Sequence, residues 1–94
     1  MTVLYRNREG EPITQEEWAR LFEIDSYKIV MRTEMGDIKV STVWLGLIHP
    51  NDMFFETMIF GGEYDQQMWR YRSEEGAQYG HVRILQALIE GREP

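Results

Sequence analysis

The sequence predicts an α+β domain in which an antiparallel sheet of about four strands is flanked by an N-terminal and a C-terminal helix. Two observations indicate this class. Four segments between residues 27 and 72 alternate apolar and polar side chains with a period of two, as strands do, whereas helical spacing occurs before and after them. Consecutive strands with helices at both ends are typical of α+β proteins. The length of 94 residues predicts a single domain over residues 1–94.

The N-terminal part predicts a short extended segment followed by a helix. Residues 4–13 are extended and are broken by a turn at residues 7–10, and Pro12 delays the helix until Thr14. Thr14 and Glu17 have the spacing of a capping box, in which the Thr14 hydroxyl accepts from the Glu17 backbone and Glu17 reaches back. An apolar face at helical spacing then predicts a helix over residues 15–23; it comprises Trp18, Leu21 and Phe22.

The central part predicts four strands. Residues 27–32 and 38–44 alternate on either side of a turn that contains Gly36, which indicates a tight hairpin. Residues 46–52 read as a loop with turn chemistry at 49–52. Residues 53–60 and 67–72 are expected to be the third and fourth strands, separated by a break at residues 61–62.

The C-terminal part predicts a helix that packs on the sheet. Ser73 is placed to cap it, and two glutamates follow in its first turn. Gly80 would allow close packing on the sheet, and Gly76 leaves open a later helix start. The expected apolar face comprises Ala77, His81, Ile84, Leu85 and Leu88.

Composition restricts the classes of function. The chain has no cysteine, which excludes disulfides, a thiolate nucleophile and a cysteine-based zinc site. The net charge of −6 disfavours direct nucleic-acid binding, because phosphate backbones are anionic. No apolar stretch is long enough for a signal peptide or a membrane span, so we expect a cytoplasmic protein without a membrane partner.

One strand combines aromatic rings with cations. Trp69, Arg70, Tyr71 and Arg72 could stack a base or a nucleotide, with His49 as a further contact. The alternative is an edge strand whose arginines face solvent, which protects against aggregation.

Glu56 and the two histidines are the remaining candidates. Glu56 lies mid-strand among apolar residues, where it could act as a general base or pair with a basic residue across the sheet. His49 and His81 could bind a metal together with Asp52 and Glu56, but their spacing matches no metal motif. The sequence therefore predicts no metal, no cofactor and no catalytic residue.

Large apolar side chains occur on both faces of the predicted strands. A two-layer domain buries only one face of its sheet, so either the first helix packs behind the sheet or a second chain covers it. Methionine and aromatic residues are enriched at interfaces, which favours a homodimer or a partner surface. The residues concerned are Met53, Phe54, Phe55, Met58, Phe60 and Met68.

Several segments resemble small uncharacterised proteins of bacteriophages, mainly those of actinobacteria. They are residues 41–47 (STVWLGL), His49, residues 55–61 (FETMIFG), and residues 71–81 with Tyr71, Ser73, Glu74, Glu75, Ala77, Gly80 and His81. The N-terminal residues Leu4, Tyr5, residues 10–13, Glu17 and Trp18 match the same group, so the resemblance covers nearly the whole chain. This chain departs from the group at Ile48, where an aspartate is usual, and in the short segment 50–52. The group has no assigned activity; the resemblance implies a phage accessory protein in the cytoplasm of the infected cell.

Two hypotheses follow. The first is a non-enzymatic protein that binds and occludes a host protein, such as a defence or transcription component, through residues 67–72 and an acidic surface. That surface would comprise Glu63, Asp65, Glu74 and Glu75. The second is a small-ligand protein, for example an oligomeric sponge for a nucleotide, with its site on residues 69–72.

Overall fold

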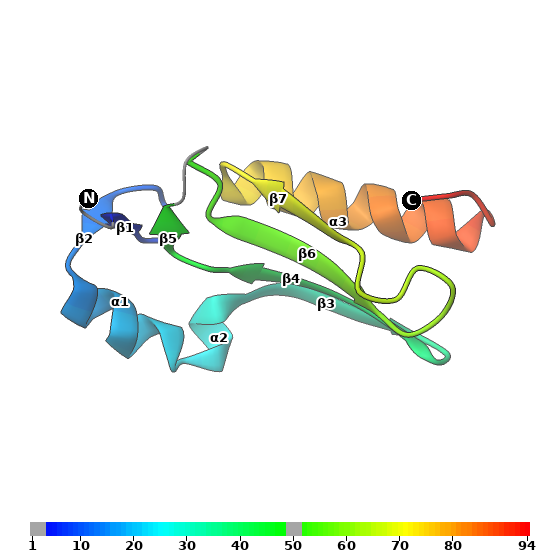
Figure 1. Cartoon of the computed structure of the whole chain (residues 1–94), viewed down its shortest axis with the longest axis horizontal. Coiled ribbons are helices and arrows are strands. Elements are labelled where there is room, and N and C mark those ends of the chain that lie inside the picture. Colours follow the sequence, from blue (N-terminus) through cyan, green and yellow to red (C-terminus); the bar gives the residue numbers. More distant parts are fainter. Residues whose placement is uncertain (1–3, 49–51) are drawn as a thin grey trace.

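The centre of the structure is a four-stranded antiparallel sheet in the order β3-β4-β6-β7 (Figure 1). The computed structural model describes residues 4–48 and 52–94. The predicted α+β class is confirmed; in the described part of the chain two helices come before the four-stranded sheet and one comes after it. The strands are β3 (Ile29–Met35), β4 (Ile38–Trp44), β6 (Phe55–Phe60) and β7 (Met68–Tyr71).

The β3–β4 hairpin is confirmed, but its first strand begins later than predicted. Gly36, with φ of +58°, supports the turn. Residues 27 and 28, predicted as strand, belong instead to a short helix, α2 (Asp25–Lys28). The Tyr27 ring packs edge-on against Trp44 at 5.0 Å, and its hydroxyl accepts from the Arg8 backbone at 2.9 Å. These long-range contacts of Tyr27, and not the period-two alternation of the sequence, decide that residues 27 and 28 are helical.

A second, small sheet lies at the N-terminal end and has the order β2-β1-β5. Its strands are β1 (Leu4–Arg6), β2 (Pro12–Ile13) and β5 (Leu47–Ile48). The extended N-terminal segment is thus confirmed. The prediction of a loop over residues 46–52 was wrong for residues 47 and 48, which form β5. β5 is a strand because it pairs with β1, about forty residues earlier, and no local pattern encodes that pairing.

Helix α1 (Gln15–Phe22) lies beyond one end of the large sheet and does not pack behind it. The Thr14 hydroxyl accepts from the Glu17 backbone at 3.1 Å, as the capping box predicts. The Trp18 ring contacts the Phe22 ring, which in turn contacts the ring of Trp44, and the Trp44 side chain is fully buried. The α1 helix therefore extends the core at the end of the sheet, and within residues 4–48 and 52–94 one face of the sheet has no helix on it.

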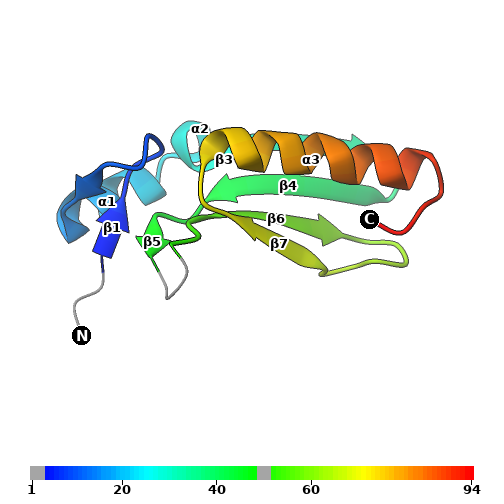
Figure 2. The ribbon, with the colours of Figure 1, turned by 90° about the horizontal axis from the view of Figure 1, so that it is seen from above.

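Helix α3 (Glu74–Ile89) covers the other face of the sheet, as Figures 1 and 2 show. It begins at Glu74, so the later start that Gly76 left open is wrong; the Gly76 N–H donates to the Ser73 capping hydroxyl at 3.0 Å. On the predicted apolar face Ala77, His81 and Ile84 are fully buried, whereas Leu85 and Leu88 are half-buried. The buried strand residues beneath the helix are Val40, Thr42, Phe55, Thr57 and Ile59.

Candidate functional site

The predicted aromatic–arginine segment does not form one surface. Strand β7 alternates, so Trp69 and Tyr71 point towards α3 and pack on the core, whereas Arg70 points to the opposite face. Arg72 follows the strand and is exposed. A flat ligand stacked on the two rings would therefore not meet Arg70 on the same side of the sheet.

Glu56 forms the cross-strand pair that the sequence offered as one of its two roles. Glu56 lies directly opposite Arg70 in the β6–β7 register, and the Glu56 carboxylate accepts from Arg70 Nε at 3.1 Å. The Glu56 side chain is 13% exposed and Arg70 is 42% exposed. This ion pair lies on the face of the sheet away from α3, and its exposed arginine limits its contribution to stability to below about 1 kcal/mol.

The structure describes only one of the two histidines, so it does not test whether they form one site. His49 lies outside the described residues. His81 is fully buried between α3 and the sheet, where its Nδ1 is 2.7 Å from the Thr42 hydroxyl and its Nε2 is 3.0 Å from the Thr33 hydroxyl. The Thr42 hydroxyl also bonds that of Thr57. His81 thus joins α3 to three adjacent strands through a buried polar network, which favours one packing of the helix.

The His81 network predicts a pH dependence of stability. Burial lowers the pKa of His81 below its ordinary value of 6.5. Below that pH the unfolded chain binds a proton more readily than the folded chain does, so the free energy of unfolding should fall as the pH drops from 7 to 5.5, by up to about 1 kcal/mol. Urea unfolding at several pH values measures this change. In His81→Leu this part of the pH dependence should vanish; an unchanged profile would show that His81 is not its source.

The acidic residues proposed for partner binding are divided between the two ends of the molecule. Glu63 and Asp65 lie in the β6–β7 turn, beside the C-terminal end of α3, whereas Glu74 begins α3 at its other end. Glu74 is also engaged, because Arg8 Nε donates to its carboxylate at 2.7 Å and lowers the pKa of Glu74. Arg8 additionally donates to the Tyr27 carbonyl at 3.1 Å, which ties α2 and α3 to the N-terminal turn. These acids do not form one patch.

The Tyr71 hydroxyl is buried and makes no hydrogen bond of good geometry with the other described residues. Burial raises the pKa of Tyr71, and the nearby Thr57 hydroxyl and the Arg83 charge oppose that shift. Tyr71 lies against Gly80 of α3, where a side chain on residue 80 would overlap the ring. Its position is therefore that of a packing residue under the helix.

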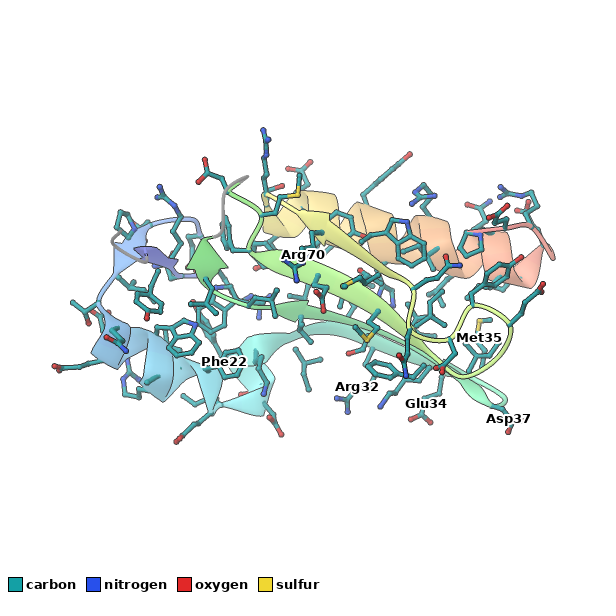
Figure 3. All side chains as sticks on the ribbon, in the orientation of Figure 1. Phe22, Arg32, Glu34, Met35, Asp37 and Arg70 are labelled. Carbon is teal, nitrogen blue, oxygen red and sulfur yellow. The ribbon has the colours of Figure 1, made fainter. Side chains whose placement is uncertain are left out.

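The face of the sheet opposite α3, which we call the open face, is the remaining candidate. No helix or strand in the described part of the chain covers it (Figure 1). Phe60 is 40% exposed and Met68 is 51% exposed there, next to the Glu56–Arg70 pair. Figure 3 shows the Arg70 side chain over the sheet on this side. The side chains of the open face are Arg32, Glu34, Lys39, Ser41, Val43, Glu56, Met58, Phe60, Met68 and Arg70.

The open face combines apolar and charged groups. Met68 lies opposite Met58 in the β6–β7 register, and the Lys39 ammonium lies over the Phe60 ring at 4.8 Å. An open hollow of about 410 Å³ continues from Phe60 and Lys39 to Glu34 at the hairpin end. The sequence indicates such a surface, because residues 53–60 have apolar side chains at both odd and even positions and therefore on both faces of the strand. Only the position of α1 in the structure shows that the second face stays uncovered.

Within residues 4–48 and 52–94, no three histidine or carboxylate side chains come together in a way that could hold a metal ion. Among the same residues, no helix is both long and apolar enough to cross a membrane. No protein-family model, curated protein or solved structure matches this chain.

Proposed function

We propose that this chain is a non-enzymatic protein-binding domain, and that it occludes a partner through the open face. The observation that supports the proposal is the asymmetry of the sheet: α3 buries one face, while Phe60 and Met68 on the other are 40% and 51% exposed. A mixed surface of methionine, aromatic and arginine side chains is typical of protein interfaces.

The partner in this proposal is a host protein in the cytoplasm of an infected bacterium, such as a defence or transcription component. The resemblance to phage proteins supports this context, and the open face supports the mode of action. The exposed Arg70 and the half-buried Lys39 lie near apolar groups and suit a partner surface with apolar residues and a few carboxylates.

The nucleotide-binding alternative has less support. Base stacking needs an accessible ring face, but Trp69 and Tyr71 are half-buried and pack towards α3. The charge that would bind phosphate, Arg70, lies on the other side and is paired with Glu56.

The open face can be tested with a variant that makes it charged. Phe60→Glu combined with Met68→Glu should keep the fold, because neither side chain belongs to the buried core, and should abolish capture of a partner from lysate of the infected host. The matched control is Tyr79→Glu with Ile89→Glu, which changes two exposed apolar residues on the outer surface of α3. Quantitative mass spectrometry of the captured proteins should show one protein retained by the wild type and the control and lost by the open-face variant.

Two results would contradict the proposal. One is a captured protein that binds the open-face variant as well as the wild type. The other is a rise of several degrees in the unfolding temperature with one nucleotide from a panel, which would support the small-ligand hypothesis instead.

A further inference from the structure

The outer edge of strand β3 is open. β3 pairs with β4 on one side only; α2 lies at its N-terminal end, and in Figures 1 and 3 no element of the described chain lies beyond the outer side of residues 31–35. The backbone groups on that edge are therefore available to pair with another strand. Arg32 and Glu34 are exposed beside this edge, and neither forms an ion pair with another described residue.

The pattern of β3 is self-complementary. After a register shift between Ile29 and Met31, the regular part of the strand is Met31, Arg32, Thr33, Glu34 and Met35. Thr33 is its centre, with one charge of each sign beside it and a methionine at each end. Reversing the strand direction therefore exchanges the two charges and leaves the apolar ends in place.

Two-fold symmetry restricts how two such edges can pair. In an antiparallel pair the residues opposite each other point to the same face, so a symmetric pair must be centred on a single residue. Centring on Arg32 places two arginines opposite each other, and centring on Glu34 does the same with two glutamates. Centring on Thr33 pairs Arg32 with the partner's Glu34 twice and matches all five regular residues. This register is favoured because opposite charges across a pair stabilise it and like charges destabilise it.

We propose that two copies of this chain associate edge to edge through β3, with the two-fold axis at Thr33. The two sheets then form one continuous sheet of eight strands. Because the axis is perpendicular to the sheet, both α3 helices lie on one side and both open faces lie on the other. The pairing uses Arg32 and Glu34 at the rim of the open face but not Phe60 or Met68, on which the partner-capture test rests, so the failure of either proposal leaves the other standing.

Charge exchange between positions 32 and 34 tests this register. In the Arg32→Glu variant two glutamates face each other at both charged pairs, and in the Glu34→Arg variant two arginines do so. Each single variant should therefore raise the dimer dissociation constant about tenfold or more. When the two variants are mixed, each charge meets its opposite, so a one-to-one heterodimer should form. Sedimentation velocity measures association, and native mass spectrometry of one isotope-labelled variant identifies the heterodimer.

The controls separate the edge from general charge effects. Arg83→Glu changes the net charge as Arg32→Glu does, but Arg83 is exposed on α3 near Tyr71 of β7, at the opposite edge of the sheet, so this variant should dimerise like the wild type. The double variant with both charges exchanged should also dimerise, because it restores the complementarity. The proposal is overturned if the wild type remains monomeric up to about 0.5 mM, a concentration at which even weak association is visible. It is also overturned if the single variants dimerise like the wild type, or if mixing them yields no heterodimer.

Discussion

Replacing Gly46 with alanine is expected to destabilise the protein by about 3–5 kcal/mol, because left-handed backbone strain and overpacking add at this position. Gly46 has φ of +74°, and a Cβ there would lie 2.6 Å from Cδ1 of Trp18 and overlap the Trp44 ring. Both rings are fixed, since Trp18 Nε1 donates to the Leu45 carbonyl and Trp44 Nε1 donates to the Arg6 carbonyl, each at 2.9 Å. Neither ring can yield without losing a hydrogen bond.

Gly91 provides a matched control for this experiment. It has the same φ of +74°, but a Cβ there would meet no atom within 4 Å. Gly91→Ala should therefore cost only the backbone strain, about 1–2 kcal/mol. Thermal unfolding followed by circular dichroism compares the two; equal decreases in unfolding temperature would show that the tryptophan contacts do not restrict position 46.

Replacing Gly80 with alanine should also destabilise the protein, although the same change in an exposed helix interior stabilises by about 1 kcal/mol. A Cβ at Gly80 would overlap the Tyr71 ring and hydroxyl, and Gly80 is buried where α3 approaches β7. Moving the ring aside or lifting the helix should cost about 1–3 kcal/mol.

A double-mutant cycle assigns this cost to Tyr71. Tyr71→Leu removes the ring, so Gly80→Ala should cost less in that background, with a coupling energy of about 1 kcal/mol or more. Tyr71→Phe should be neutral or stabilising by itself, because it removes a buried hydroxyl that lacks a hydrogen bond among the described residues. Additive effects of Gly80→Ala and Tyr71→Leu in urea unfolding would contradict the assignment.

These two glycines also show that the aromatic residues act mainly in packing. Trp18, Trp44 and Tyr71 are held against backbone that has no room for a side chain. The sequence placed Trp18 on the apolar face of the first helix, and it offered Tyr71 as part of a ligand site. The structure places Tyr71 beneath α3, so its aromatic character serves the helix–sheet contact. The surface available for recognition is left to the open face and the β3 edge.

The local pattern of the sequence by itself determined the α+β class, the β3–β4 hairpin and both helix caps, because period-two alternation, Gly36, Thr14 and Ser73 act within a few residues. It also offered the pairing of Glu56 with a basic residue as one of two roles, and the structure shows that pair with Arg70. Contacts over long sequence distances were decided only by the tertiary structure. They made β5 a strand and residues 25–28 a helix. They also placed α1 at the end of the sheet, and an uncovered face results from that placement because which face a helix buries depends on the whole fold.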